Sequence, residues 1–182
     1  TQPCLESLFE TTDVPARLFI VDNGSAPHVR EFLRTVAPRG AITEVVLLQN
    51  ETNEGFPRGM NRRFQASTAP FICLLNNDLR FSPGWLRELM AVAAAHKPLG
   101  VLNPMSHPPA RGESLRSCAQ RLAPSRGQYV EAGMCVGFCM LIKREVVERV
   151  GLLSEEVERI FFEDEDFCMR ALQADYRCGV AK

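Results

Sequence analysis

The sequence has almost no net charge and no long apolar run. It holds 21 lysines and arginines against 22 aspartates and glutamates, a formal net charge of −1. Proteins that bind nucleic acid or anionic lipid by bulk electrostatics carry a basic excess, so we expect neither as a partner. The longest uncharged apolar stretch, 132–142, is about half of the ~20 residues that a membrane helix needs. We therefore expect no membrane span in this chain.

Histidines are scarce, and the cysteines are not arranged in pairs. Three histidines and seven cysteines are scattered along the chain, and only Cys135 and Cys139 approach the short spacing of a zinc site. We predict reduced, buried thiols rather than zinc ligands or disulfides. With no signal peptide, reduced thiols indicate a cytoplasmic protein, either free or held peripherally at the inner membrane face.

No internal repeat interrupts the chain, and its 182 residues are enough for one folded domain. Short β-branched runs alternate with amphipathic stretches through the first hundred residues. This alternation with short connections predicts an α/β fold with a mostly parallel sheet flanked by helices. The predicted strands are 17–21, 44–48, 70–75 and 99–102, and the predicted helices are 29–36, 56–66 and 83–93, the last with Ser82 as its N-cap.

The second part of the chain is less regular. We predict an irregular, basic insertion over 103–131, because prolines break it and the four arginines within 111–126 face one acid, Glu113. A strand over 133–142 and a helix over 144–150 follow. The segment 154–166 then holds seven acids, so the near-zero net charge hides a basic and an acidic segment.

Polar residues follow the ends of the predicted strands. Asp22 ends the first strand, Asn53 lies a few residues past the second, and Asp78 follows the third. Ligands of open parallel sheets bind beyond the carboxyl ends of the strands, so these residues are candidates for one site. Asp and Asn are also ordinary turn and N-cap residues, and that reading stays open for each of them.

Two segments have the chemistry of a phosphate and metal site. The loop 53–63 opens a helix with two glycines and three arginines, which suits a phosphate, although a solvated basic helix face would read the same. It matches neither a P-loop nor the Rossmann glycine fingerprint. Asn76, Asn77 and Asp78 offer hard oxygen ligands suited to Mg²⁺ or Mn²⁺ held largely by substrate phosphates.

An acidic turn near the end of the chain offers a general base. Asp164 shares the inward stripe of a helix with Phe167 and Cys168, which favours a carboxylate that faces a cleft. Simple capping of the helix by its acids is the alternative. Asp166 and Arg170 are spaced as an i, i+4 ion pair.

Taken in order, five motifs resemble the family 2 inverting glycosyltransferases of GT-A fold, most closely a rhamnosyltransferase-like subgroup. The motifs are Val21-Asp22-Asn23-Gly24-Ser25, Asn53-Glu54-Gly55-Phe56 with Asn61, Leu74-Leu75-Asn76-Asn77-Asp78, Gly137 to Arg144, and Phe162 to Asp166 with Arg170. The resemblance implies transfer of a sugar, with inversion, from a UDP- or dTDP-sugar to a glycan or lipid-linked acceptor in polysaccharide or glycoconjugate synthesis.

The resemblance also implies a role for each matching residue. Asp164 would be the catalytic base, and Asp78 would hold the divalent metal, Mg²⁺ or Mn²⁺. The nucleotide would be bound by Asp22, Asn53, Gly55, Asn61 and Asn77, and the donor and acceptor side would be formed by Gly137, Glu163, Asp166 and Arg170. The nucleotide-binding half would cover about 1–102 and the acceptor-side half about 103–182.

The chain departs from the family pattern in several places. Asn76 stands where the metal signature usually starts with Asp, Pro57-Arg58 replaces small residues, and Gly151-Leu152-Leu153 replaces the usual acceptor-side loop. The family's first strand and its C-terminal acceptor elements are not found, so we expect a chain truncated at both ends. Two alternatives stay open: a non-catalytic nucleotide-sugar-binding module, and a sugar-phosphate nucleotidyltransferase, which would need a glycine- and arginine-rich signature at the chain start.

Overall fold

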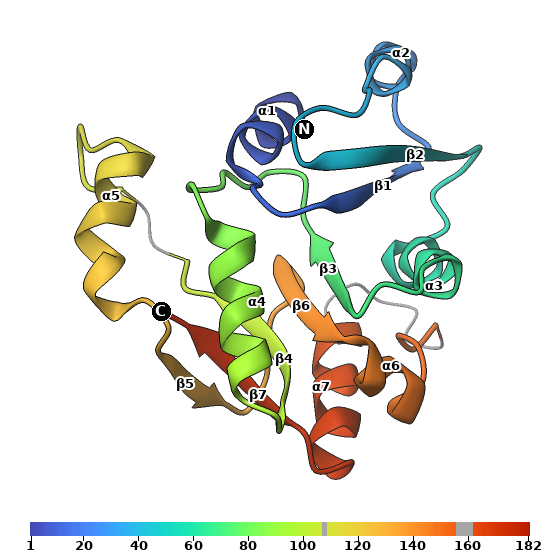
Figure 1. The fold of residues 1–182 in the computed structure, drawn as a ribbon. Helices are drawn as coiled ribbons and strands as arrows, with labels where there is room; N and C mark the ends of the chain where they lie inside the picture. Colours follow the sequence, from blue (N-terminus) through green and yellow to red (C-terminus); the bar gives the residue numbers. More distant parts are fainter. Residues whose placement is uncertain (107–108, 156–161) are drawn as a thin grey trace.

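The computed structural model describes residues 1–106, 109–155 and 162–182 (Figure 1). Glu156 and Glu158 of the acidic segment lie outside the described residues. None of the helices in these ranges is long and apolar enough to cross a membrane. In chain order, the elements are α1 (Gln2–Thr11), β1 (Ala16–Asn23), α2 (Pro27–Arg34), β2 (Ile42–Asn50), α3 (Phe56–Ala66), β3 (Phe71–Leu75), α4 (Trp85–Ala95), β4 (Leu99–Pro104), α5 (Leu115–Leu122), the short 3₁₀ helix η1 (Ala123–Ser125), β5 (Tyr129–Ala132), β6 (Cys139–Lys143), α6 (Arg144–Val150), α7 (Glu163–Gln173) and β7 (Arg177–Ala181).

The strands form two hydrogen-bonded sheets. β1 and β2 pair in parallel, and a five-stranded sheet has the order β3-β6-β4-β7-β5. In the larger sheet only β4 and β7 are parallel neighbours, while β3 with β6, β4 with β6, and β5 with β7 are antiparallel. The prediction of a mostly parallel sheet is therefore wrong, because the main sheet is mixed.

The physical reason for this error is the position of β6. β3 and β4 are joined through a helix and run in the same direction, as predicted, but β6 returns between them and pairs with both. Strand–helix alternation fixes the direction of successive strands, but it does not determine which strands are neighbours in the sheet. A strand that arrives from later in the chain can therefore change a parallel pair into two antiparallel ones.

Helices cover both faces of the five-stranded sheet, and alternate residues of each strand point to opposite faces. On β6, Met140 and Ile142 pack in one core with α6 and α7, while Leu141 packs with α4 in a second core. A third core lies under α1 and α2 and includes Leu8 and Leu33. Figure 1 shows α4 on one side of the sheet and α6 and α7 on the other.

Several element boundaries differ from the predictions. α4 begins at Trp85 rather than at Pro83, because Ser82, Pro83 and Gly84 form a turn in which Gly84 has φ +80° and Trp85 N–H donates to Ser82 O at 3.3 Å. The segment predicted as irregular contains α5 and β5, and the predicted strand 133–142 narrows to β6, with a loop over 133–138.

Within the described residues, no strand lies between β1 and β3. The interval is a cavity of about 520 Å³, lined on one side by Leu18 and Ile20 of β1 and on the other by Ile72 and Leu74 of β3. The carboxyl ends of these two strands carry three of the predicted site residues: Asp22 at the end of β1, and Asn77 and Asp78 just after β3.

Candidate active site

Asp22, at the end of β1, is almost completely buried and organises the first part of the site. Its side chain is 2% exposed. Oδ1 accepts a hydrogen bond from Ser25 N–H at 2.9 Å, Oδ2 accepts one from Gln49 Nε2 at 3.1 Å, and Arg30 Nε lies 3.4 Å from Oδ2. The carboxylate thus closes the turn after β1 and ties it to β2 and α2.

The environment of Asp22 favours its ionised form. Burial by itself raises the pKa of this carboxyl, but hydrogen bonds from Ser25 and Gln49 and the charge of Arg30 outweigh burial and lower the pKa. The side chain therefore carries a negative charge at neutral pH inside a network that already uses both of its oxygens.

The loop before α3 packs against the turn after β1. Asn53 Oδ1 accepts from Gly55 N–H at 2.9 Å, and Asn23 Nδ2 donates to Gly55 O at 3.0 Å. A Cβ on Gly24 would lie 3.2 Å from Asn53 N, so only glycine lets the two loops approach this closely. The structure thus brings the predicted nucleotide residues Asp22, Asn53 and Gly55 together through direct contacts between neighbouring loops.

Two arginines of α3, Arg58 and Arg62, have carboxylate partners. Arg62 Nη2 lies 3.0 Å from Glu54 Oε2, and Arg58 Nε lies 3.6 Å from Glu155 Oε2. Both arginine side chains are more than half exposed. A phosphate near the start of α3 would compete with these exposed pairs, which are weak in water.

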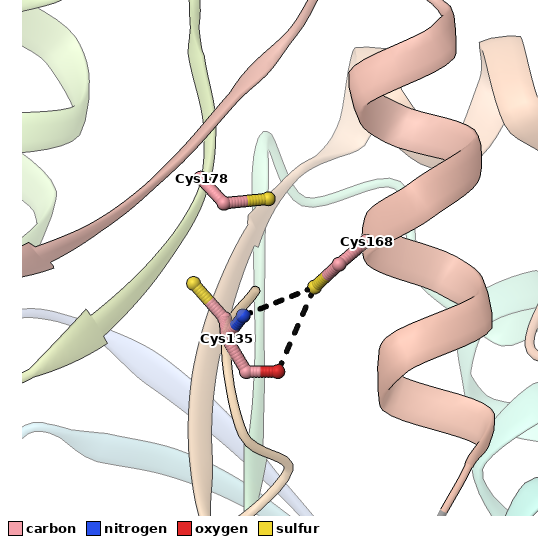
Figure 2. A group of neighbouring side chains, drawn as sticks. All are labelled: Cys135, Cys168 and Cys178. Carbon is pink, nitrogen blue, oxygen red and sulfur yellow. Dashed lines mark hydrogen bonds between the residues drawn. The ribbon is translucent and has the colours of Figure 1, made fainter. Parts of the chain in front are cut away.

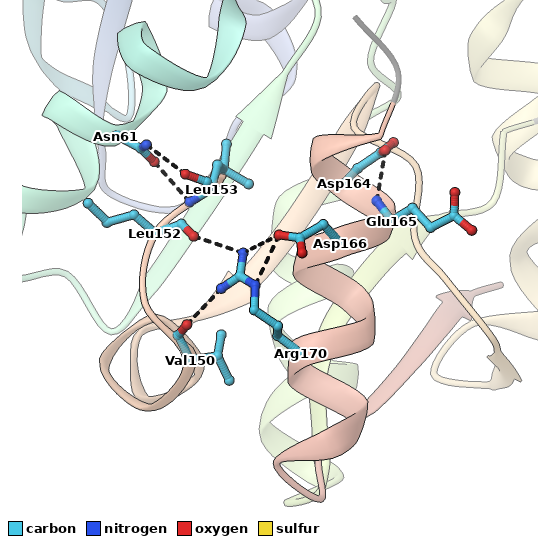
Figure 3. A network of polar contacts seen from close by, with 8 residues as sticks. All are labelled: Asn61, Val150, Leu152, Leu153, Asp164, Glu165, Asp166 and Arg170. Carbon is cyan, nitrogen blue, oxygen red and sulfur yellow. Dashed lines mark hydrogen bonds and ion pairs between the residues drawn. The ribbon is translucent and has the colours of Figure 1, made fainter. Parts of the chain in front are cut away.

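Asn61 has a different position from the other predicted nucleotide residues. It is buried on α3, where Nδ2 donates to Leu153 O at 2.9 Å and to Glu155 Oε1 at 2.8 Å, and Oδ1 accepts from Leu153 N–H at 3.0 Å. Figure 3 draws the reciprocal pair with Leu153. Its amide holds the segment after α6 in place, so the geometry favours a positioning role.

The end of β3 carries the predicted metal ligand. Asn76, Asn77 and Asp78 are exposed, and Asn77 Nδ2 donates to Thr1 Oγ1 at 3.0 Å. Asp78 makes no hydrogen bond or ion pair with the described part of the chain. An exposed carboxylate that the protein does not use, beside two amide side chains, fits the oxygen ligands that Mg²⁺ and Mn²⁺ prefer.

Asp164 lies in the first turn of α7 and is held by backbone N–H groups. Oδ2 accepts from Gly137 N–H at 2.9 Å and Oδ1 from Glu165 N–H at 2.9 Å, the latter drawn in Figure 3. Both Asp164 and the neighbouring Glu163 are half-buried. The predicted base and the predicted donor-side residue Gly137 are therefore in direct contact.

Asp166 and Arg170 form the predicted ion pair, and Arg170 also donates hydrogen bonds to two backbone carbonyls. Its Nε and Nη2 lie 3.0 and 2.7 Å from Asp166 Oδ2, while Nη1 donates to Val150 O at 2.6 Å and Nη2 to Leu152 O at 2.9 Å (Figure 3). The guanidinium thus ties α7 to the carbonyl end of α6 and to the segment that Asn61 holds. We attribute to this pair a positioning role on the predicted acceptor side.

Asn103 is a positioning residue that the sequence analysis missed. It is buried at the end of β4, where Nδ2 donates to Val136 O at 2.9 Å and to Cys139 O at 2.7 Å, and Oδ1 accepts from Val136 N–H at 2.7 Å. Its amide fixes both sides of Gly137. The signal in the sequence is an amide that ends an apolar strand just before Pro104, a pattern that turn chemistry explains equally well.

Comparison with known proteins identifies the family. The model of the family described as Glycosyl transferase family 2 matches residues 1–151. The chain belongs to glycosyl transferase family 2. No curated protein matches the sequence.

Solved structures share the fold of this family 2 chain at low sequence identity. One of them is GalNAc-T7 with UDP, GalNAc and Mn²⁺, with TM-score 0.71 and 14% identity. The match covers 98% of this chain and 39% of the GalNAc-T7 chain. The mannosyltransferase PcManGT from Pyrobaculum calidifontis with GDP-Man and Mn²⁺ has TM-score 0.68 and 19% identity, with 98% and 49% covered. S. aureus TarS 1-349 with UDP-GlcNAc has TM-score 0.66 and 17% identity, with 98% and 51% covered.

These likenesses establish the fold of the family 2 chain as α/β of GT-A type. The chain spans between 39% and 51% of the length of these three structures. The matching model describes glycosyl transferase family 2 as a whole. The rhamnosyltransferase-like subgroup stays a prediction.

Proposed function

We propose that this family 2 chain is the donor-binding and catalytic part of a nucleotide-sugar-dependent glycosyltransferase that inverts the anomeric carbon. One observation carries the proposal: hydrogen bonds connect the predicted metal strand to the predicted base. Asn76 N–H, at the end of β3, donates to Phe138 O at 2.8 Å, and Gly137 N–H donates to Asp164 Oδ2. Asp164 and Asn76, which lies two residues before Asp78, are thereby attached to one short loop.

The donor side is formed by the loops after β1, β2 and β3. Asn53 and Gly55 lie against the turn that Asp22 closes, and Asn77, two residues after β3, lines the cavity between β1 and β3. We assign the nucleoside to these loops. Asn61 acts through the segment 153–155 that it holds.

Asp78 would hold the divalent cation, Mg²⁺ or Mn²⁺, with the sugar diphosphate. When bound, the cation supplies positive charge to the diphosphate, where negative charge develops during transfer. Two solved structures that share the fold, GalNAc-T7 and PcManGT, were obtained with Mn²⁺, which supports a divalent cation for this chain.

In the reaction, Asp164 takes the proton of the acceptor hydroxyl as its oxygen attacks the anomeric carbon. The bond from that carbon to the diphosphate oxygen breaks, and its electron pair leaves with the diphosphate. Gly137 N–H aims one carboxylate oxygen, so the other presents its free lone pair to the acceptor. Attack opposite to the leaving group inverts the configuration.

We place the donor half within about 1–102 and the acceptor half within about 103–182, where Glu163, Asp166 and Arg170 lie. A UDP- or dTDP-sugar donor, a glycan or lipid-linked acceptor, the rhamnosyltransferase-like subgroup and a location in the cytoplasm or at the inner membrane face are parts of the same proposal. UDP and UDP-GlcNAc in the TarS structures support a uridine or related nucleotide.

Thermal unfolding of the purified chain with UDP-, dTDP- and GDP-sugars, each with Mn²⁺ or with EDTA, tests the proposal. A ligand at about 100 times its Kd stabilises the folded state by about 2.7 kcal/mol, which raises Tm by roughly 5–10 °C in a domain of this size. We expect such a rise for one nucleotide class in Mn²⁺ and a smaller rise in EDTA, with the free sugar as the inactive control.

The same samples separate the alternatives. Stabilisation without sugar release or transfer would favour a non-catalytic binding module. Pyrophosphate formation from a nucleoside triphosphate and a sugar phosphate would favour a nucleotidyltransferase. Absence of stabilisation by every nucleotide would contradict the proposed function.

A further inference from the structure

Three cysteines from separate parts of the sequence meet in the core behind the candidate active site. Cys135 lies in the loop 133–138, which also carries Gly137, Cys168 lies on α7, and Cys178 lies on β7 (Figure 2). Their sulfur atoms all lie within 4.8 Å of one another, and the residues are 0%, 0% and 1% exposed. The described residues contain no other such group of three or more metal-ligating side chains.

Backbone groups hold the sulfur atoms in place. Cys135 N–H donates to Cys168 Sγ at 3.2 Å, and the Cys168 thiol, when protonated, donates to Cys135 O at 3.6 Å (Figure 2). Cys135 Sγ donates to Gly179 O at 3.3 Å. An N–H directed at a sulfur stabilises a thiolate and is a common support for metal-bound sulfur.

The surroundings of Cys168 and Cys135 shift the pKa values of their thiols in opposite directions. Hydrogen bonds from the thiols of Cys135 and Cys178, with the Cys135 N–H, lower the pKa of Cys168 despite its burial. The hydrogen bond to Cys168 and burial raise the pKa of Cys135 to about 12.

We propose that Cys135, Cys168 and Cys178 bind one thiophilic divalent cation through three thiolates. A cation about 2.3 Å from each sulfur in tetrahedral geometry places the sulfur atoms about 3.8 Å apart, so small side-chain movements suffice. Three thiolates select soft or borderline cations such as Zn²⁺ and Cd²⁺, whereas the oxygen ligands around Asp78 select hard ones. Each thiol releases its proton when it binds the cation as a thiolate, and three thiolates with one divalent cation leave one net negative charge on the cluster.

The loop that contains Cys135 lies partly at the surface of the molecule. Its neighbours Met134 and Val136 are 39% and 49% exposed, and a Cβ on Gly133 would have no atom within 4 Å. The loop also connects the cluster to the candidate base, since Gly137 lies two residues after Cys135 and Asp164 lies one helical turn before Cys168. The cation site itself does not depend on the proposed glycosyltransferase activity.

Titration of the reduced, metal-free chain with Cd²⁺ tests the site directly. We expect one equivalent to bind tightly, with a sulfur-to-cadmium charge-transfer band of an intensity that corresponds to three thiolates, and we expect Zn²⁺ to displace it. Native mass spectrometry counts the ions bound per chain. Release of protons into a weakly buffered solution on addition of the ion is the third readout.

Serine variants locate the ligands. C135S, C168S and C178S should each weaken Cd²⁺ binding by at least about 100-fold and reduce the charge-transfer band. C118S is the matched control, because Cys118 is a buried cysteine on α5 outside the cluster, and it should bind like the wild type. Thermal unfolding without metal checks that each variant folds.

Three results would overturn the site: no tight equivalent in the wild type, full binding in the variants of the cluster, or a band that corresponds to fewer than three thiolates. If a serine variant does not fold, the wild-type band and its proton release still decide. Loss of binding in C118S would likewise place the cation elsewhere.

Discussion

At the scale of single residues, the aspartates of the candidate site have unlike surroundings. Asp22 is buried and both of its oxygens are used by the chain, whereas Asp78 is exposed and makes no hydrogen bond or ion pair with described residues. Asp164 lies between these extremes, half-buried and held by one backbone N–H on each oxygen. These differences are consistent with three roles: a structural carboxylate at Asp22, the proposed metal ligand at Asp78 and the proposed base at Asp164.

Replacing Asp164 by Asn should remove the base and keep its shape. We expect Asp164→Asn to bind nucleotide sugar within about twofold of the wild type and to lose transfer by about 10²–10⁴-fold, because the amide cannot accept the acceptor proton. Donor binding measured by calorimetry and turnover measured on the same samples check this.

Glu165→Gln is the matched control, since Glu165 lies in the same helical turn and has no assigned role. It should keep its turnover. Wild-type turnover in Asp164→Asn would remove Asp164 from the base assignment.

Asp22 should make stability depend on pH in the acid range. Its folded-state pKa lies below the unfolded value of about 3.9, so the stability it contributes is complete above that value. This contribution is lost as pH falls through the folded pKa. Urea unfolding from pH 7 to pH 3 should therefore show a steeper acid loss in the wild type than in Asp22→Asn.

At neutral pH, Asp22→Asn should also lower the free energy of unfolding by about 1–3 kcal/mol, because Ser25 N–H and Arg30 lose an ionised partner. Gln128→Ala, a change at an exposed neutral residue, should keep the wild-type pH profile. An Asp22→Asn profile identical to that of the wild type would contradict the structural role of this carboxylate.

At the scale of elements, the site depends on two segments without regular structure. The loop 133–138 is held by Asn103 from β4 and contacts Asp164, and the segment after α6 is held by Asn61 from α3 and by Arg170 from α7. In each case a buried or half-buried side chain satisfies backbone groups of a segment that has no partner strand. The rigidity of the site therefore comes from side-chain amides and a guanidinium.

Asn103→Ala should loosen the loop that carries Gly137. The change leaves two carbonyls and one N–H without their partner, so we expect a loss of roughly 2–3 kcal/mol in the free energy of unfolding. Transfer should fall more than nucleotide binding does, because the loop positions Asp164 rather than the nucleoside.

Urea unfolding and turnover of Asn103→Ala check both effects, with Gln128→Ala expected within about 0.5 kcal/mol of the wild type. If Asn103→Ala had the same free energy of unfolding as the wild type, water would be replacing the hydrogen bonds of the amide without loss of stability. That result would contradict the positioning role of Asn103.

At the scale of the whole molecule, local signals and distant contacts explain what the sequence could and could not predict. The strands β1, β2 and β3 and the helices between them follow from periodicity. Gly137 contacts Asp164, and the sequence analysis placed both residues in the predicted acceptor-side half of the chain. The insertion of β6 between β3 and β4 depends on pairing between distant segments, which no local pattern specifies.

The same limit applies to the polar and thiol clusters. Asn103 reads as a turn residue until β4 is placed beside the loop 133–138. Cys135, Cys168 and Cys178 have no metal-ligand spacing in sequence, and only the fold brings their sulfur atoms together. Short-range patterns predict where polar chemistry lies along the chain, whereas three-dimensional contacts decide which residues act together.

The central claim is that the loops after β1, β2 and β3 bind a nucleotide sugar with a divalent cation at Asp78. Calorimetric titration of a UDP-sugar into the wild-type chain in Mn²⁺, in EDTA, and into Asp78→Asn in Mn²⁺ tests it most directly. Asp175→Asn, at an exposed aspartate outside the site, is the control. We expect at least about tenfold tighter binding in Mn²⁺ than in EDTA for the wild type and for the control, and no Mn²⁺ effect for Asp78→Asn. Equal affinity in Mn²⁺ and EDTA, or a full Mn²⁺ effect in Asp78→Asn, would contradict the claim.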